Sequence, residues 1–455
     1  MEASSNKRSH WGSRIGFILA AAGSAVGLGN IWKFPYVTGE NGGGIFVLIY
    51  LGCVLLVGLP VMIAEILIGR STQNSPVGAF KSLAGARSPW VGMGWLSVLS
   101  AFVLLSFYSV VAGWSLHYAW LSISGKLAGL GPDNVATVFG SLHASVGANL
   151  FWHLAFMGLT IAVVYGGVSK GVERWSRILM PALLIMMLVL LINSLTLDGF
   201  GRAFRFLFGF HQDKFTAGGA LEALGQAFFS LSLGMGAMLT YGSYLRRRDD
   251  IVGASVTISA LDTCIALVAS LMLFPIIFSY GMEPAAGPGL VFISVPIALS
   301  QMPGTTFLAT VFFGLLVFAA LTSAISMLEV ATSYLIDQRG WQRQRAAVAA
   351  GLTTAILGLP AALSGGTRLF GSGMEAMLGR NWFDSLDYLV TNWMLPLGGL
   401  GIALFTAWRM DRRLRQEEFL SGSRLRLFYQ GWVFLLKFPV PVAILLVFLH
   451  AVGVL

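Results

Sequence analysis

Long apolar runs separated by short polar connections fill most of the 455-residue sequence. A run of about 20 apolar residues is long enough to cross the hydrocarbon core of a bilayer as a helix. Only helices and closed barrels satisfy their backbone polar groups in lipid, and these runs lack the alternation of barrel strands. The pattern predicts an all-α polytopic membrane protein with eleven spans, at about 14–37, 45–68, 92–123, 150–167, 174–194, 219–244, 250–280, 305–337, 343–363, 381–408 and 428–454.

Glycines interrupt two of these runs, the first and the sixth. They are Gly23, Gly27 and Gly29 in the first run, and Gly234 and Gly236 in the sixth. Glycine destabilises a helix interior by about 1 kcal/mol relative to alanine, so such clusters weaken a helix locally. Gly23 and Gly27 also fit a small-residue packing motif. Interrupted segments at matching positions of two halves favour an inverted-repeat transporter with a site at the membrane midplane.

The interrupted runs lie five spans apart, where two five-helix repeats would each begin. We therefore predict a first repeat over 1–194 and a second over 219–408. An extracellular loop at 195–218 joins them, and a cytoplasmic linker and the eleventh helix occupy 409–455. The outer segments 195–218 and 281–304 could be extracellular lids or packed loops.

Charged residues are few and unevenly placed. They make up 11% of the chain, against about 25% in soluble domains, so the chain has no ordinary water-facing surface. Basic residues cluster in alternate connections, such as Lys7, Arg8 and Arg14; Arg70, Lys81 and Arg87; and Arg246, Arg247 and Arg248. This positive-inside pattern predicts a bacterial inner-membrane protein with a cytoplasmic amino terminus and an outward carboxyl terminus. The net charge of +9 therefore reflects topology and not binding of nucleic acid.

Polar side chains inside the apolar runs are costly and are candidates for function. They include Asn30, Glu65, Ser230, Ser232, Asp262, Thr322, Ser323, Glu329 and Asp387. Oxygen ligands of this kind suit hard cations, and half-helices starting near Gly29 and Gly236 would aim free amide groups at a carboxylate. Together they predict a site for a zwitterion and small cations.

Simpler interpretations stand beside this one. Thr322 and Ser323 could bond back to the preceding helical turn, and Glu65 and Glu329 could be structural acids between helices. No nucleotide-binding loop, metal-ligand spacing or nucleophile–base pair occurs, and Cys53 and Cys264 both lie in apolar runs. The sequence therefore does not predict an enzyme, and no oligomeric state follows from it.

The stretch AAGSAVGLGNIWKFPYVTGENGGGIF closely resembles the signature of the neurotransmitter:sodium symporter family. The likeness continues through GVSKGVERWSRILMP, QAFFSLSLGMGAM and FAALTSAISML. With eleven predicted spans, the chain is most similar to the bacterial amino-acid branch of that family. The resemblance implies the leucine-transporter fold, an inverted five-plus-five helix repeat with discontinuous helices 1 and 6, working by alternating access.

The resemblance also implies two sodium sites and one substrate site. The first sodium would bind Ala25, Asn30, Ser230 and Asp262 with the substrate carboxylate, and the second Gly23, Val26, Ala319, Thr322 and Ser323. The substrate would lie against Ala25, Gly27, Gly29, Leu104, Tyr108, Phe229, Ser230, Ser232, Met235, Ser326 and Met327.

Gates and a hinge follow from the same resemblance. Lys33 and Asp387, with Phe229 as a lid, would form the outer gate, and Arg8, Trp11, Tyr244 and Asp337 the inner one. Gly171 and Pro181 would let the fifth span unwind; a simple kinked helix start is the alternative. Lys33 replaces the arginine common at the outer gate, and lysine cannot form a bidentate pair.

Two positions narrow the implied function. Asp262 stands where the leucine transporter has asparagine, and its fixed negative charge predicts transport that is independent of chloride. Gly27 stands where monoamine-carrying relatives have aspartate, which favours a substrate that brings its own carboxylate. The apolar pocket predicts a sodium-coupled symporter of neutral hydrophobic L-amino acids, and methionines adapt to varied side chains. A transport-inactive amino-acid sensor of the same fold is the alternative.

Overall fold

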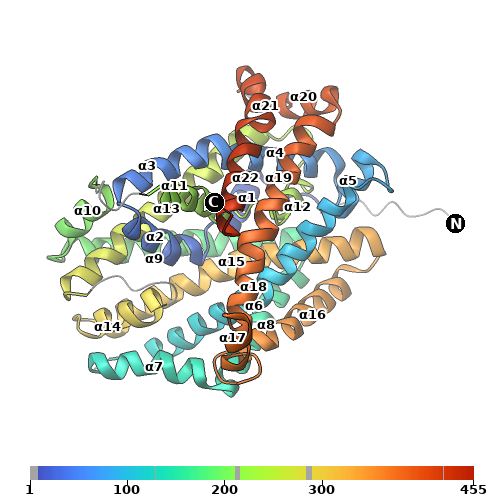
Figure 1. Cartoon of the computed structure of the whole chain (residues 1–455). Coiled ribbons are helices and arrows are strands. Elements are labelled where there is room, and N and C mark those ends of the chain that lie inside the picture. Colours follow the sequence, from blue (N-terminus) through green and yellow to red (C-terminus); the bar gives the residue numbers. More distant parts are fainter. Residues whose placement is uncertain (1–8, 129, 211–215, 283–288, 424, 455) are drawn as a thin grey trace.

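The structure is a computed structural model that describes residues 9–128, 130–210, 216–282, 289–423 and 425–454. It is a bundle of helices in which segments distant in sequence pack side by side (Figure 1). The described residues form no strand, apart from one isolated bridge between Gly43 and Phe210.

The first five predicted spans correspond to helices with several π-helical turns, labelled η. They are α1 (Arg14–Ala25), η1 (Gly29–Lys33) and α2 (Phe34–Glu40); α3 (Gly44–Cys53), η2 (Val54–Gly58) and α4 (Leu59–Thr72); α6 (Val91–Ile123); α8 (Val146–Tyr165); and η3 (Val168–Glu173) with α9 (Arg174–Leu195).

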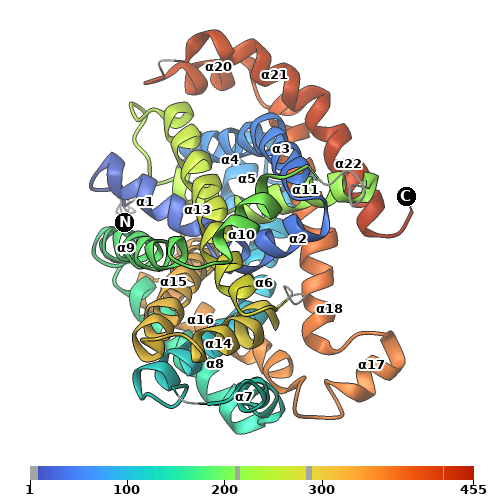
Figure 2. The ribbon, with the colours of Figure 1, turned by 90° about the vertical axis from the view of Figure 1, so that its left-hand side faces the viewer.

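The remaining spans follow in the same manner. They are α11 (Ala217–Ser230) and α12 (Ala237–Gly242); α13 (Ile251–Ser279); α15 (Thr305–Arg339); α16 (Arg343–Leu363); α18 (Trp382–Tyr388), η6 (Leu389–Met394), α19 (Leu395–Leu404) and η7 (Phe405–Arg409); and α21 (Tyr429–Lys437) with α22 (Pro439–Ala451). Figure 2 shows α20, α21 and α22 along one side of the bundle.

Within the described residues, nine helices are long and apolar enough to cross a membrane. The pair Arg14–Ala25 and Gly29–Glu40, bent by 54°, makes a tenth span if counted as one. The sixth predicted span is divided between α11 and α12, each of them short. Both spans predicted to be discontinuous are therefore broken.

The two breaks have local causes in the backbone. Val26, at the end of α1, is extended, with φ −71° and ψ 97°, so the helix stops there. Between α11 and α12, Ser232, Gly234 and Gly236 all have positive φ, of 54°, 84° and 73°. Two of these three are glycines, which adopt such angles without steric cost. Ser232 is the one non-glycine residue of the three, and its hydroxyl donates to the Ser24 carbonyl at 2.8 Å.

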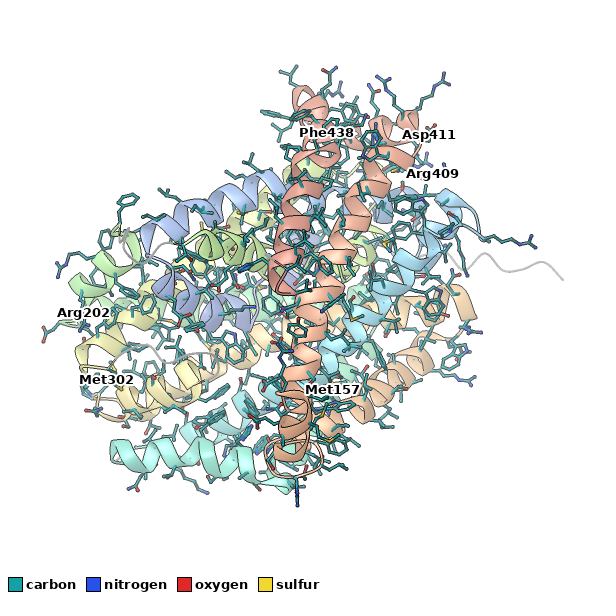
Figure 3. All side chains as sticks on the ribbon, viewed as in Figure 1. Met157, Arg202, Met302, Arg409, Asp411 and Phe438 are labelled. Carbon is teal, nitrogen blue, oxygen red and sulfur yellow. The ribbon has the colours of Figure 1, made fainter. Side chains whose placement is uncertain are left out.

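The connections contain short helices that the sequence pattern did not predict. They are α5 (Pro76–Ala84), α7 (Pro132–Ala144), α10 (Phe200–Phe208), η5 (Leu290–Ser294) with α14 (Val295–Ser300), α17 (Ser372–Leu378), α20 (Arg412–Leu420) and the 3₁₀ turn η8 (Arg426–Phe428). The segments 195–218 and 281–304 thus hold packed helical turns, with Ala203 and Leu207 of α10 and Leu290 and Val291 of η5 buried. Arg202 of α10 and Arg409 with Asp411 lie at opposite sides of the molecule (Figure 3).

Candidate functional site

The end of α1 exposes backbone oxygens toward the middle of α15. The Ser323 hydroxyl lies 3.4 Å from the Gly23 carbonyl oxygen, 3.2 Å from that of Ser24 and 3.5 Å from that of Val26. Because α1 stops at Ala25, the last carbonyls have no amide partners further along the helix. A hydroxyl facing three carbonyl oxygens is a set of hard oxygen ligands for a small cation.

Thr322, one residue earlier, makes different contacts. Its hydroxyl donates to the carbonyl oxygens of Phe318 and Ala319 in its own helix, both at 3.0 Å. The simple interpretation of back-bonding therefore describes Thr322 but not Ser323. Thr322 still packs close to α1, since a Cβ on Gly23 would lie 3.1 Å from its Cβ.

Three polar side chains from three elements meet beside the first break. Asn30 of η1 donates to Asp262 Oδ1 at 2.8 Å and to the Ser230 hydroxyl at 3.0 Å. Ser230 donates to Asp262 Oδ2 at 2.7 Å. All three are fully buried. Asp262 has no basic partner among the residues that the structure describes, and a buried carboxylate in that state is costly, so this cluster is suited to hold a cation.

Two buried residues that the sequence analysis did not name adjoin this cluster. The hydroxyl of Tyr50 lies 3.5 Å from Asp262 Oδ2. The amide of Gln226 donates to the Gly29 carbonyl at 3.3 Å, while its own carbonyl oxygen has no hydrogen-bond partner. The available signal was a polar group within an apolar run, which many structural tyrosines and glutamines share.

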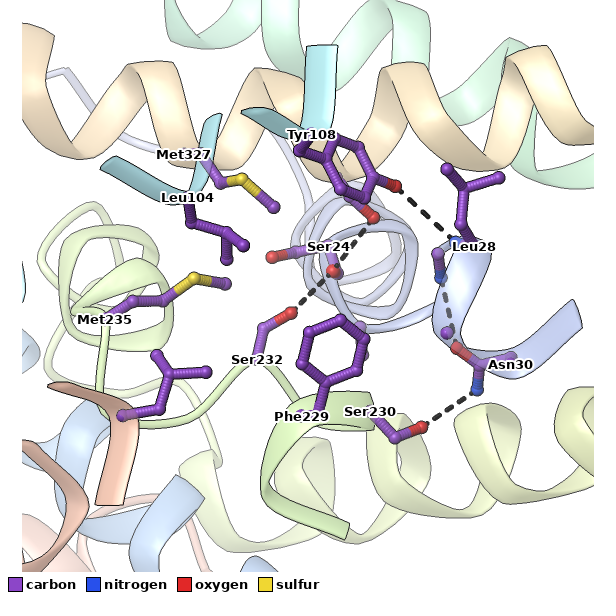
Figure 4. Close-up of a pocket in the computed structure, with 15 residues that line it drawn as sticks. Ser24, Leu28, Asn30, Leu104, Tyr108, Phe229, Ser230, Ser232, Met235 and Met327 are labelled. Carbon is purple, nitrogen blue, oxygen red and sulfur yellow. Dashed lines mark hydrogen bonds between the residues drawn. The ribbon is translucent and has the colours of Figure 1, made fainter. Parts of the chain in front are cut away.

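A small pocket lies between the two broken spans, with about 20 Å³ of space open to a water-sized molecule (Figure 4). Its lining includes most of the predicted substrate residues: Ala25, Gly27, Gly29, Leu104, Tyr108, Phe229, Ser230, Ser232, Met235 and Met327. Leu28, Ser323 and Leu395 join them. Ser326 does not line the pocket; its hydroxyl accepts a hydrogen bond of 2.7 Å from Ser24, which does.

Three apolar side chains of the pocket lie together on the side away from Tyr108 and Asn30 (Figure 4). The Leu28 amide donates to the Tyr108 hydroxyl at 3.5 Å, and Ser232 donates to the Ser24 carbonyl at 2.8 Å. The three apolar side chains are Leu104, Met235 and Met327 (Figure 4). The chemistry of the lining therefore suits a molecule with a charged head and an apolar side chain.

Two glycines leave the room that the cavity needs. A Cβ on Gly27 would lie 2.8 Å from the Ser323 hydroxyl and 3.3 Å from the Tyr108 hydroxyl. A Cβ on Gly29 would lie 2.6 Å from the Phe229 ring. The two glycines thus let the first break approach α6, α11 and α15.

Of the predicted outer-gate residues, Lys33 contacts Phe229, and Lys33 and Asp387 form no ion pair. The Lys33 ammonium lies 4.5 Å from the centre of the Phe229 ring. Asp387 accepts a hydrogen bond from Thr391 at 3.1 Å. Phe229 lines the cavity and packs against the hydrophobic core.

At the opposite end, the start of α1 is attached to the end of α12. The Trp11 indole donates to the Tyr241 carbonyl at 2.9 Å, and the Trp11 amide to the Tyr244 carbonyl at 3.2 Å. Asp337 accepts from the Ser75 amide at 2.7 Å. Arg8, the remaining predicted inner-gate residue, lies outside the described residues.

The two acids that the sequence left open both have defined partners. Glu65 accepts from the Gly234 amide at 2.7 Å, in the break of the sixth span. Glu329 accepts a two-point contact from Arg343 and a hydrogen bond of 2.6 Å from the Tyr244 hydroxyl. Both acids are fully buried. Glu65 therefore joins α4 to the break of the sixth span, and Glu329 joins α15 to Arg343 and to Tyr244.

Gly171 lies in the π-helical turn η3, and Pro181 inside α9. A Cβ on Gly171 would lie 2.1 Å from the Val163 carbonyl oxygen of α8, so this turn needs glycine for close packing. The packing requirement and an unwinding role are compatible, because a π-helical turn already departs from regular helix.

These features define a class of protein. A helical membrane protein with two broken spans, whose breaks meet at a pocket lined by polar and apolar groups, has the architecture of a secondary transporter. The sequence profile described as "Sodium:neurotransmitter symporter family" matches residues 8–137 and 134–452, nearly the whole chain. The chain therefore belongs to this family.

Individual relatives agree. A sodium-dependent transporter of Bacillus subtilis, YhdH, is 40% identical over 99% of each chain. A bovine sodium- and chloride-dependent taurine transporter is 27% identical over 80% of this chain and 67% of its own length. The crystal structure of MhsT in complex with L-phenylalanine covers 98% of this chain and 100% of MhsT, with 43% identity and a TM-score of 0.89.

The comparisons confirm the predicted family and fold. In the structure, helices 1 and 6 are both broken, as predicted. Since the family and these relatives are transporters, the chain is a membrane transporter coupled to sodium and not an enzyme.

Proposed function

We propose that this chain imports neutral hydrophobic L-amino acids across a bacterial inner membrane, driven by sodium. The observation that carries the proposal is the pocket between the two breaks, with Leu104, Met235 and Met327 on the side away from Tyr108 and Asn30. The solved complex of the related MhsT with L-phenylalanine supports a substrate of this class. The positive-inside pattern supports a cytoplasmic amino terminus and an outward carboxyl terminus.

The proposed first sodium binds Asn30, Ser230 and Asp262 with the backbone of Ala25. The substrate carboxylate completes this shell and accepts a hydrogen bond from the Tyr108 hydroxyl. Coupling follows, because each ligand then stabilises the site of the other. The Asp262 carboxylate supplies the negative charge beside the ion, so transport does not require chloride.

The proposed second sodium binds the carbonyls of Gly23, Val26 and Ala319 with the hydroxyls of Thr322 and Ser323. Ser323 already faces the carbonyls of α1. A rotation of the Thr322 hydroxyl away from Phe318 would free it for the ion. The ion would thereby join α1 to α15 and hold the inner pathway closed.

Alternating access then proceeds between two gates. Lys33, Asp387 and Phe229 close the outer side after binding, and Arg8, Trp11, Tyr244 and Asp337 open on the inner side. In the present structure Trp11 is buried and attached to Tyr241. Unwinding at Gly171 and Pro181 would admit water to the second sodium site.

Uptake by the purified protein in proteoliposomes tests this function. An inward sodium gradient is expected to accumulate labelled Leu, Phe or Trp, because the sodium shell includes the substrate carboxylate. Replacing external sodium with potassium should remove the accumulation, and replacing chloride with gluconate should leave it unchanged. A chloride requirement would contradict the role given to Asp262.

The sensor alternative makes a different prediction in the same experiment. A sensor would bind these amino acids in a sodium-dependent way and accumulate none of them. Accumulation without saturation, or without any effect of the amino acid supplied, would contradict both interpretations.

Substitution of Gly27 by alanine is expected to weaken amino-acid binding about 10-fold or more, equivalent to about 1.4 kcal/mol. The added Cβ would lie 2.8 Å from the Ser323 hydroxyl, so that hydroxyl or the first break must move. Equilibrium binding of labelled phenylalanine measures the change. Gly52→Ala is the control, since nothing lies within 4 Å of a Cβ there. Unchanged affinity in Gly27→Ala would place the substrate elsewhere.

A further inference from the structure

The beginning of the first span is attached to the beginning of the fifth through one buried carboxylate. Glu173 is the last residue of η3, and its side chain is 4% exposed. Its Oε2 accepts from the Gly12 amide at 2.7 Å, and its Oε1 from the Ser13 hydroxyl at 3.5 Å. Arg177, one turn later, donates to Oε1 at 2.5 Å.

Two further contacts join the same two segments, and one of them is a hydrogen bond from Arg177 to the Ser13 hydroxyl. The Ser169 hydroxyl donates to the His10 carbonyl at 3.2 Å. Residues 10–13 are therefore attached to both ends of η3. The same residues are attached to the sixth span through Trp11 and the carbonyls of Tyr241 and Tyr244.

The space for the carboxylate exists because α1 carries glycine where it passes Glu173. A Cβ on Gly16 would lie 2.1 Å from Glu173 Oε1, and one on Gly12 would lie 3.2 Å away. Ser13 is the N-cap of α1, so the carboxylate also lies at the end of the helix whose dipole favours negative charge. The space left by the glycines and the helix dipole therefore both favour an acidic side chain against the start of α1.

The other end of α1 carries the carbonyls proposed to bind the second sodium. Gly23 there is packed against α9, since a Cβ on it would lie 3.2 Å from Met180 Sδ. Regular helix joins the two ends over Arg14–Ala25. A displacement of the sodium-binding end is therefore transmitted to Gly12 and Ser13, and from there to Glu173.

We propose that Glu173 is a positioning residue that makes the start of α1 and the π-helical turn η3 move together. Occupancy of the second sodium site then controls whether residues 168–173 stay helical. This inference rests on the sodium-coupled function proposed above, because it requires sodium to hold α1 in place.

The contact is suited to open and close repeatedly. When α1 moves away, Glu173 loses Gly12 and Ser13 but keeps Arg177, which belongs to its own helix and has a side chain 46% exposed. The carboxylate is thus never left buried and unpaired, a state that would be strongly destabilising.

Hydrogen exchange of the full-length transporter in lipid nanodiscs, in sodium or in potassium, tests the proposal. In the wild type, sodium is expected to slow exchange of residues 168–173 about fivefold or more, the lower end of typical couplings between sites. Glu173→Gln should reduce this protection to less than about twofold. Every partner of the carboxylate is a hydrogen-bond donor, and the amide nitrogen of glutamine is a donor too, so it cannot accept their hydrogen bonds.

A second variant approaches the contact from the other helix. Gly16→Ala places a Cβ where Glu173 Oε1 lies and should remove the sodium protection of 168–173 to the same extent. Gly158→Ala, at a helical position with nothing within 4 Å, and Glu417→Gln, at an exposed acid, are the matched controls and should keep the wild-type response.

The outcomes separate this inference from the proposed function. Sodium protection that persists in both Glu173→Gln and Gly16→Ala overturns the role of Glu173. The role of Glu173 is also overturned if sodium does not protect residues 168–173 in the wild type although sodium-dependent phenylalanine binding is intact. If Glu173→Gln fails to fold, Gly16→Ala decides. Wild-type protein that neither binds nor accumulates amino acids with sodium would contradict the transport function instead.

Discussion

Replacement of Asp262 by alanine is expected to abolish sodium-driven uptake, with a loss of about 100-fold or more. Asp262 accepts hydrogen bonds from Asn30 and Ser230 at 2.8 and 2.7 Å, and all three are buried. A hydrogen bond to a charged group contributes about 1.5–3 kcal/mol, so the loss of two accounts for more than 100-fold. The proposed sodium loses its only side-chain charge as well. Initial rates of uptake in proteoliposomes measure the effect.

Two further variants make the test specific. Asp198→Ala removes an exposed aspartate in the connection after α9 and should leave uptake unchanged. Asp262→Asn keeps the size and shape of the side chain but removes its negative charge. The remaining uptake of this variant should depend on external chloride. Wild-type uptake by Asp262→Ala would exclude this residue from the first sodium site.

The broken spans and the cavity could be predicted from the sequence because their causes are local. Gly234 and Gly236 adopt positive φ, and glycine is the residue that does so without strain. Gly27 and Gly29 leave space beside Tyr108 and Phe229, which places the first break against the cavity. Such effects depend on the residue itself and are readable along the chain.

Contacts between distant helices could not be predicted in the same way. Ser323 reaches the carbonyls of α1, while Thr322 bonds within its own helix. The side chains of adjacent residues in a helix point about 100° apart. The packing angle of α15 therefore decides which of the two side chains faces α1. Tyr50 was missed for this reason, since its helix had to be placed against α13 first.

Ionic contacts at the helix ends were equally hidden. Glu173 lies between the basic residues Lys170 and Arg174, and nothing local in the sequence marks it as buried. Its partners are a backbone amide and a hydroxyl at the start of another span. The function of a charge at a membrane boundary therefore depends on which helix packs beside it.

Loss of the Arg343 side chain is expected to destabilise the transporter by about 3–5 kcal/mol, the usual cost of leaving one partner of a buried ion pair alone. Arg343, at the start of α16, makes a two-point contact with Glu329 of α15, and Glu329 is fully buried. The guanidinium also donates to the Val164 carbonyl of α8 at 3.2 Å. Thermal unfolding in detergent should therefore shift strongly downward in Arg343→Gln.

The control and the paired variant identify the cause. Arg339→Gln removes an exposed arginine from the end of α15 and should leave unfolding nearly unchanged. Glu329→Gln combined with Arg343→Gln should recover part of the lost stability, because neither charge then remains buried without a partner. Tyr244 donates to Glu329 at 2.6 Å, so loss of the ion pair between Arg343 and Glu329 also weakens a contact at the end of the sixth span. A single variant as stable as the wild type would show that the pair contributes little and that the inner side is held closed by Trp11 and its contacts instead.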